Sequence, residues 1–194
     1  MINKRFKDKR LILASASPRR QYLLKELGLD FEILAPQVRE DYPANLTPEQ
    51  IAVYLAELKA NNFDSSRFQG DTILITADTI VSIGDEILGK PGNYQEAVCM
   101  LGKLSGQKHD VITAVCLKSK TRQKTFHVLS SVYFKKLSME EIDYYIENFR
   151  PFDKAGGYGV QEWIGYIGIT KIEGSFFNVM GLPVRELYEE LLRF

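Results

Sequence analysis

Two adjacent arginines stand at a position where cations are normally unfavourable. Arg19 and Arg20 follow Ser17, which is expected to cap a helix, and Pro18, which is expected to begin it. The amino end of a helix carries a partial positive charge, so two guanidinium groups there suggest a negatively charged ligand. With free backbone N–H groups and serine hydroxyls such as that of Ser15, they would suit a polyphosphate. The alternative is that both arginines simply point into water.

An acidic residue interrupts an otherwise apolar strand. Asp78 lies inside the run 75–81, ITADTIV, which is typical of a buried strand. A carboxylate is costly there unless a cation, a metal or an ordered water accompanies it. Thr76 and Thr79 add oxygen atoms nearby, so this group could orient a hard cation or activate a water. The alternative is an acid at the end of the strand that faces solvent.

Two loops add further candidates. Lys90 lies between Gly89 and Pro91 and could meet a phosphate, although exposed loop lysines are common. The stretch 153–161 reads DKAGGYGVQ, and its glycines permit close approach of the backbone to a ligand. Within it, Lys154 supplies a cation, and Gln161 offers the donor and acceptor that suit a nucleobase edge. Neither a GxxxxGK[ST] loop nor a GxGxxG fingerprint occurs in the chain.

The elements that position these residues alternate between strands and helices. Strands are expected at 10–14, 31–34, 72–82, 86–88, 109–118, 125–136 and 166–172. Helices are expected at 18–27, 48–61, 94–104, 139–148 and 184–192. The stretch 151–165 has no clear period, and 174–183 is expected to be a loop. This order predicts an α/β fold with a mixed central β-sheet flanked by helices, and residues 1–194 are expected to form one domain.

Composition narrows the function further. The chain has 194 residues, of which 25 are Lys or Arg and 25 are Asp or Glu, so its formal net charge is zero. This balance argues against a protein that coats nucleic acid, and no apolar segment is long enough for a membrane span. Cys99 and Cys116 have no metal or redox spacing, which predicts buried thiols in a cytoplasmic protein. His109 and His127 are expected to be structural, without a zinc site or a Ser-His-Asp triad.

Five segments, in this order, resemble the Maf family of nucleoside triphosphate pyrophosphatases. They read LILASASPRRQYLLKELG, TADTIVSIGDEILGKP, AVCMLGKLSGQKHDVITAV, DKAGGYGVQ and IEGSFFNVMGLP. The resemblance extends over residues 10–194. It implies an elongated Maf/Ham1-like (ITPase-like) fold with two lobes around an active-site cleft. It also implies hydrolysis between the α and β phosphates, which gives the monophosphate and pyrophosphate.

The resemblance also assigns roles to individual residues. Asp78 matches the family's proton acceptor. Positions that set substrate choice are matched by Arg19, Thr79 and Gln161. Positions expected around the phosphates are matched by Ser15, Arg20, Lys59, Lys90 and Lys154. Glu40 lies where the family often has an acidic residue near the metal, so Asp78 and Glu40 are expected to hold a divalent cation, Mg²⁺ or Mn²⁺. Arg20 should mainly hold phosphate, whereas Arg19 should also help to select the nucleotide.

The branch of the family follows from two motifs. Members that act on dTTP and UTP carry the motif A-D-T in the strand and Y-G-[IV]-Q in the glycine-rich loop. Members of the 7-methyl-GTP branch carry D-Q in the strand, and their loop ends in S-E instead. Thr79 and Gln161 therefore favour dTTP and UTP, with modified pyrimidine nucleotides as further substrates. Leu58 and Glu162 depart from the family pattern, and Glu162 could alter the pocket on the base side.

The resemblance leaves several alternatives open. The leading hypothesis is a pyrimidine nucleotide pyrophosphatase that keeps modified nucleotides out of nucleic acids and takes part in cell-division arrest. A different hypothesis is a nucleotide-binding regulator of septum formation without significant turnover. The presence of Asp78 argues for turnover, since a pure binding protein would not need this carboxylate. The family also implies a homodimer, with neither nucleic acid nor membrane as a partner.

Overall fold

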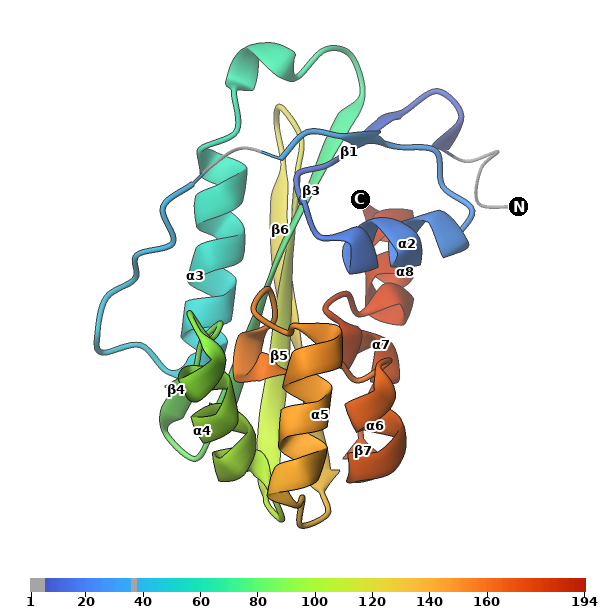
Figure 1. Ribbon diagram of the computed structural model, residues 1–194. Coiled ribbons are helices and arrows are strands. Elements are labelled where there is room, and N and C mark those ends of the chain that lie inside the picture. The colour runs from blue at the N-terminus through green and yellow to red at the C-terminus, as the bar shows by residue number, and fades with distance from the viewer. Residues whose placement is uncertain (1–5, 36–37) are drawn as a thin grey trace.

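A mixed seven-stranded sheet forms the centre of the molecule (Figure 1). The computed structural model describes residues 6–35 and 38–194. The strand order is β2-β1-β3-β5-β6-β7, and β4 pairs with β3 outside this path. β1 runs parallel to β2 and β3, whereas the other pairs are antiparallel. The strands are β1 (Arg10–Leu13), β2 (Glu32–Ile33), β3 (Thr72–Ile83), β4 (Glu86–Leu88), β5 (Lys108–Lys118), β6 (Gln123–Phe134) and β7 (Ile169–Glu173).

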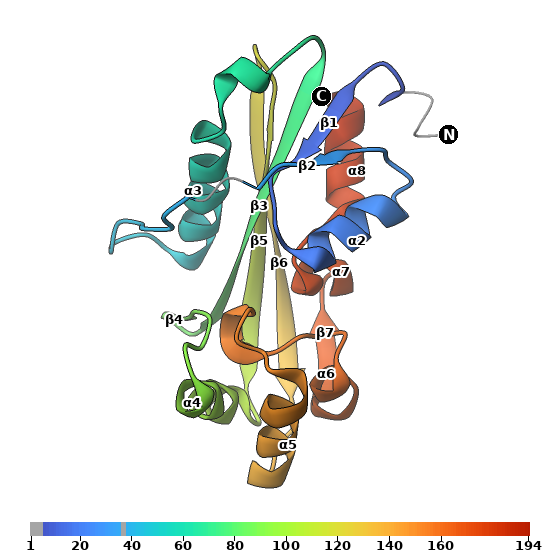
Figure 2. The same cartoon turned by 45° about the horizontal axis from the view of Figure 1, so that its top comes forward.

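Helices cover both faces of this sheet. They are α2 (Pro18–Glu26), α3 (Pro48–Asn61), α4 (Tyr94–Leu104), α5 (Met139–Phe149), α6 (Trp163–Gly168), α7 (Phe176–Met180) and α8 (Val184–Arg193). Two 3-10 turns, η1 (Ser65–Arg67) and η2 (Ala155–Gly157), complete the described elements. Figure 2 shows α3 on one side of the long strands and α2, α7 and α8 on the other, with α4, α5 and α6 towards one end. Within 6–35 and 38–194, no helix is long and apolar enough to cross a membrane.

The two faces of β3 belong to different hydrophobic clusters. Successive side chains of a strand point to opposite faces of the sheet. Leu74 and Ile80 accordingly pack with the residues of α3, whereas Ile75 and Val81 pack with those of α2, α4, α5 and α8. The same alternation sends Asp78 towards α3 and its neighbour Thr79 towards α2. One strand therefore supplies polar groups to both sides of the sheet.

One edge of β3 is open in its middle. β1 pairs with residues 72–75 of β3, and β4 pairs with residues 81–83. β5 occupies the opposite edge along 74–82. The backbone edge at 76–80 thus faces a gap in the sheet rather than another strand. This gap is the place where groups from both faces of the sheet can meet.

The segment that precedes β7 differs from the sequence prediction. A strand was expected at 166–172, but α6 occupies Trp163–Gly168 and β7 begins only at Ile169. Glycines allow this helix to pack closely: a Cβ on Gly165 would lie 2.0 Å from the carbonyl oxygen of Val160. Close tertiary packing therefore outweighs the strand propensity of this sequence. The stretch 151–165, which showed no period, also contains η2 and the start of α6.

Two smaller expectations were also wrong. The stretch 174–183 is not only loop, because Ser175 caps the short helix α7 and Gly181 ends it with a φ of 113°. Cys99 is exposed, whereas Cys116 is buried as predicted. The inward face of α4 is formed by Ala97 and Leu101, so a residue two positions after Ala97 points away from the core.

Candidate functional site

A cavity of about 520 Å³ opens at the gap in the sheet. Its volume is within the usual range for small-molecule sites. All ten residues selected from the sequence line it: Ser15, Arg19, Arg20, Glu40, Lys59, Asp78, Thr79, Lys90, Lys154 and Gln161. They come from segments far apart in the chain, so the fold brings together what the sequence separates.

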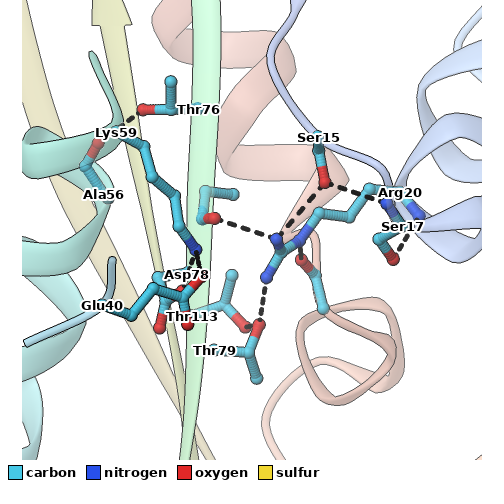
Figure 3. Close-up of polar contacts among 12 residues, drawn as sticks. Ser15, Ser17, Arg20, Glu40, Ala56, Lys59, Thr76, Asp78, Thr79 and Thr113 are labelled. Atoms are coloured by element: carbon cyan, nitrogen blue, oxygen red, sulfur yellow. Dashed lines mark hydrogen bonds and ion pairs between the residues drawn. The ribbon is translucent and has the colours of Figure 1, made fainter. Parts of the chain in front are cut away.

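On the α3 side, Asp78 shares a lysine with Glu40. Lys59 lies in the last turn of α3, and its ammonium donates to Asp78 Oδ1 and lies 2.8 Å from Glu40 Oε1 (Figure 3). Thr76 does not add an oxygen for a cation beside Asp78, as the sequence suggested, because its buried hydroxyl donates to the carbonyl of Ala56 at 2.6 Å and fixes α3 against β3. The side chains of Asp78 and Lys59 are only 9% and 14% exposed. The carboxylate in the strand is thus stabilised by a cation instead of facing solvent.

The charges around Glu40 favour its ionised form. Partial burial acts to raise the pKa of this carboxyl. The hydrogen bond from Lys59 and the positive charges of Lys59, Lys90 and Arg20 outweigh that effect, so the pKa lies below its ordinary value. The ionised Glu40 and Asp78 therefore face the same side chain, that of Lys59.

On the α2 side, Arg20 is held by neutral oxygen atoms. It donates to the backbone carbonyls of Ala77 at 2.9 Å and Gly181 at 2.8 Å, and to the Thr79 hydroxyl at 2.9 Å (Figure 3). A longer contact of 3.5 Å reaches Ser15 Oγ. The Ala77 carbonyl belongs to the open edge of β3, so the guanidinium group takes the place of a neighbouring strand. Among the described residues, none of the carboxylates forms an ion pair with Arg20.

Arg20 is partly buried, and this also affects its ionisation. Removal from water lowers the pKa of this guanidinium below its usual value, while the nearby Asp78 carboxylate acts in the opposite direction. Arginine nevertheless stays charged in proteins. A positive charge held only by neutral acceptors retains a strong attraction for an anion. This side of the cavity is therefore suited to a phosphate group.

The third wall of the cavity pairs two cations with two acids. Arg19 Nη1 lies 3.0 Å from Asp153 Oδ2, and Lys154 Nζ lies 2.7 Å from Asp153 Oδ1. Lys154 also lies 3.1 Å from Glu162 Oε1. Partial burial acts to raise the pKa of Asp153, but the hydrogen bonds from Lys154 and Arg19 bring it below its ordinary value. Arg19 therefore lies over the cavity and is paired, rather than pointing freely into water.

The glycine-rich loop 153–161 is fixed from two sides. Gly156 has a φ of 71°, a conformation that favours glycine, and its N–H donates to the carbonyl of Gly89 at 2.9 Å. This bond connects the loop to the segment that carries Lys90. The hydroxyl of Tyr158 lies 2.7 Å from His109 Nε2, and both side chains are buried. Burial lowers the pKa of His109 to about 4, so this histidine is neutral and structural, as predicted.

Gln161 offers an unused hydrogen-bond acceptor. Its Oε1 is buried but has no partner among the described residues. A buried acceptor without a donor is unfavourable, so this atom is available to a hydrogen-bond donor that enters the cavity. The N3–H of uracil or thymine is a donor of the required kind. The other predicted structural histidine, His127, is exposed and does not line the cavity.

The residues present fit a divalent metal only if the ligand contributes to its coordination. The described residues contain no group of three His, Cys, Asp or Glu that could hold a metal ion. Asp78 and Glu40 nevertheless converge on one cation, the ammonium of Lys59. Magnesium commonly binds one or two carboxylates together with substrate phosphates. Two hard oxygen donors at this point meet that requirement.

Several residues of the site were not selected from the sequence. Thr113 lies 3.0 Å from Thr79 Oγ1 and donates to the carbonyl of Asn178 at 3.0 Å. The amide of Asn178 is buried and donates to the carbonyl of Val111 at 3.0 Å. Asp153, which pairs with both Arg19 and Lys154, was also missed. Asn178 could have been found, because it is a polar residue within an apolar segment. Asp153 could not, because an acidic residue in a loop is common and does not by itself indicate a site.

The fold and the cavity together define a class of protein: an α/β protein with a polar cleft suited to a polyanion. The structure is similar to that of the Staphylococcus aureus Ham1 protein, with a TM-score of 0.50 over 93% of this chain and 99% of that one. The sequence identity is 13%, so this similarity concerns the fold alone. It confirms the predicted mixed α/β, Ham1-like architecture.

The family follows from the sequence comparisons. The family model described as Maf-like protein matches residues 10–194. The chain is 50% identical to the dTTP/UTP pyrophosphatase of Flavobacterium psychrophilum, over 99% of this chain and 98% of that protein. It is 52% identical to the dTTP/UTP pyrophosphatase of Porphyromonas gingivalis, over 97% and 96% of the two chains. The chain belongs to the Maf family, which confirms the resemblance seen in its motifs.

Proposed function

We propose that this protein hydrolyses dTTP and UTP, and modified pyrimidine nucleotides, to the monophosphate and pyrophosphate. The observation that carries this proposal is the cavity itself. One strand, β3, presents the carboxylate of Asp78 on one face and, on the other, the hydroxyl of Thr79, which accepts a hydrogen bond from Arg20 of α2. The names of relatives about 50% identical over nearly the whole chain support the same reaction.

The cationic residues of the cavity suit the triphosphate. Among its described lining residues, five are Lys or Arg and three are Asp or Glu. Arg20 would bind phosphate through its one free N–H, on Nη2, and through the N–H that makes only the long contact with Ser15, while neutral oxygens fix its plane. Lys90 and Lys154 would contact other phosphate oxygens as point charges. The hydroxyl of Ser15, which also lines the cavity, would donate to the same chain of oxygens.

Asp78 would act on the attacking water. Hydrolysis of a triphosphate needs a water in line with the bond that breaks and neutralisation of the leaving pyrophosphate. Asp78 lies at the gap, and its Oδ1 is held by Lys59, so the carboxylate has a fixed position from which to accept a proton. Lys59 would hold Asp78 in place and then balance the negative charge that accumulates on the phosphates.

Asp78 and Glu40 would hold the divalent metal, Mg²⁺ or Mn²⁺, together with phosphate oxygens. When bound, such an ion neutralises phosphate charge and polarises the phosphorus that is attacked. The excess of two positive charges among the described lining residues does not balance a triphosphate, which supports a requirement for a further cation.

The selection of the base would depend on Gln161. Its unpartnered Oε1 would accept the N3–H that uracil and thymine share, and its amide NH₂ would donate to a ring carbonyl. Arg19 and Thr79 complete this assignment, since Arg19 is held over the cavity by Asp153. Cytosine lacks the N3–H and should be rejected.

The alternative of a nucleotide-binding regulator of septum formation without turnover is not favoured. A pure binding protein gains nothing from two carboxylates that share one ammonium group in the cavity, because their excess negative charge repels phosphate. A role in cell-division arrest, a homodimer, a cytoplasmic location and the absence of nucleic-acid or membrane partners stay predictions from the sequence.

A panel of nucleotides tests the proposal. Pyrophosphate and orthophosphate release would be measured separately for dTTP, UTP, CTP, dATP and 7-methyl-GTP, each with Mg²⁺, with Mn²⁺ and with a chelator. We expect pyrophosphate from dTTP and UTP, at least tenfold less from the others, and none with the chelator. Faster cleavage of a purine nucleotide would refute the substrate assignment, and orthophosphate as the product would refute the reaction.

A further inference from the structure

The side chain of Glu162 stands behind the cavity wall and contacts one of its cations. Glu162 Oε1 lies 3.1 Å from Lys154 Nζ, while Oε2 accepts a hydrogen bond from the hydroxyl of Tyr145. We propose that Glu162 is a positioning residue, which acts through Lys154 and directs that ammonium group towards the leaving phosphates. This inference rests on the proposed pyrophosphatase reaction and names a residue that determines its rate.

The position of Glu162 is fixed on three sides. The hydroxyl of Tyr145, a residue of α5 whose side chain is fully buried, donates to Glu162 and accepts the backbone N–H of Gly159 at 3.0 Å. A Cβ on Gly159 would lie 2.7 Å from Glu162 Cδ, so the carboxylate packs directly against this glycine. The same interactions therefore connect Glu162 to the loop that carries Gln161 and to the core of the molecule.

Lys154 has a defined number of donors. An ammonium group has three N–H bonds. Asp153 accepts one of them at 2.7 Å, Glu162 Oε1 forms an ion pair with the same nitrogen at 3.1 Å, and the Lys154 side chain is 9% exposed. Since Lys154 also lines the cavity, the N–H that these acids leave free is available to a ligand. The two acids thus fix the direction of this donor before the nucleotide binds, which is the preorganisation that electrostatic catalysis requires.

The two acids are not equivalent. Asp153 also binds Arg19 and is 59% exposed at its side chain, whereas Glu162 is 19% exposed and is held by Tyr145. Asp153 is therefore free to move with Arg19, and Glu162 provides the fixed reference for Lys154. Loss of the Glu162 charge would also remove a repulsive group from the neighbourhood of the phosphates. The proposal therefore predicts opposite effects on turnover and on affinity.

Glu162→Gln tests this directly. A glutamine has no negative charge and one carbonyl oxygen in place of two carboxylate oxygens, so it loses the ion pair with Lys154 or the hydrogen bond from Tyr145 while its volume stays almost the same. We expect kcat for dTTP to fall about tenfold, because small displacements of a catalytic group have effects of this size. The Kd of a non-hydrolysable α,β-imido dTTP should stay equal or become lower. Tyr145→Phe, which leaves the charge but removes its support, should lower kcat as well.

Glu173→Gln is a matched control. Glu173 also accepts from a tyrosine, Tyr133, at 2.8 Å and pairs with a lysine, Lys171, but it lies outside the cavity. We expect kcat and Kd to stay unchanged in this variant. The comparison separates the effect of the cavity from that of losing a Tyr–Glu–Lys cluster in general.

The outcomes are distinct. A kcat of Glu162→Gln within twofold of the unsubstituted protein would overturn the proposal. A parallel loss of kcat and analogue affinity, with a lower Tm, would also overturn it, since that pattern indicates a structural role. If the unsubstituted protein releases no pyrophosphate, the proposed function fails. The analogue then still tests the contact, because a weaker Kd in Glu162→Gln would contradict the predicted repulsion.

Discussion

The charged side chains on the two faces of β3 have different partners. Towards α3, two carboxylates share one ammonium, so negative charge is in excess around Asp78, Glu40 and Lys59. Towards α2, the charge of Arg20 is held by carbonyl and hydroxyl oxygens alone. Adjacent residues of one strand, Asp78 and Thr79, serve the two arrangements because strand side chains alternate.

This difference indicates where each part of a substrate belongs. An ion pair that is already satisfied binds an added anion weakly, whereas a buried cation with only neutral partners attracts one strongly. The phosphates should therefore contact the α2 side, and cations should gather at the α3 side. The gap in the sheet at residues 76–80 allows both sides to act on the same molecule.

The largest expected effect comes from removing the excess charge on the α3 side. Asp78→Asn keeps the shape of the side chain but cannot accept a proton from water, so turnover of dTTP should fall about a thousandfold. The affinity for the non-hydrolysable analogue should be kept or increased. Single-turnover pyrophosphate release and calorimetry measure the two effects. A variant that kept most of its activity would show that Asp78 is structural.

Asp143→Asn is the control for this substitution. Asp143 accepts a hydrogen bond from Tyr94 at 2.6 Å, between α4 and α5, and does not line the cavity. Turnover should not change in this variant. A similar loss in both variants would contradict a specific role of Asp78.

The second effect distinguishes the two arginines. Arg20→Ala removes the cation of the α2 side and leaves Ala77, Thr79 and Gly181 without a donor, so kcat/KM should fall about a hundredfold for every nucleotide. Arg19→Ala should have a smaller effect and should change the ratio of kcat/KM for dTTP to that for CTP or dATP. Equal losses on every substrate for both variants would refute this division of roles.

Local signals in the sequence predicted part of the site, and the family resemblance supplied the rest, including Lys59 and Glu40. A helix cap followed by two arginines and an acid within an apolar strand each broke a local rule, and such violations concentrate at functional sites. Capping boxes and alternating apolar residues likewise predicted α3, α5 and the long strands. The sequence did not reveal which of these residues interact, because the partners lie far apart in the chain. Lys59 and Asp78 are 19 residues apart, and Arg19 and Asp153 are 134 apart.

The errors have a common physical origin. α6 and α7 have 6 and 5 residues, too few for a helical period to show in the sequence, and contacts with distant segments stabilise them. Gly168 packs against Phe134, and the carbonyl of Asn178 in α7 accepts the hydroxyl of Thr113. Since these contacts are long-range, local patterns did not reveal them. The gap in β3 was missed for the same reason, because strand order determines which backbone edge stays open.

The smallest effect concerns the metal. In the free protein the ammonium of Lys59 lies between Asp78 and Glu40, where the proposed metal would bind. Lys59→Met removes this competing charge, so the nucleotide-free protein should bind Mn²⁺ about fivefold more tightly, a modest gain because Glu40 is partly exposed to solvent. Electron paramagnetic resonance of free Mn²⁺ measures this without turnover.

Lys103→Met, which removes the exposed partner of Glu86, should leave the affinity unchanged. Weaker Mn²⁺ binding in Lys59→Met would mean that the metal does not use these carboxylates, and the excess negative charge on the α3 side would then serve only to hold Lys59.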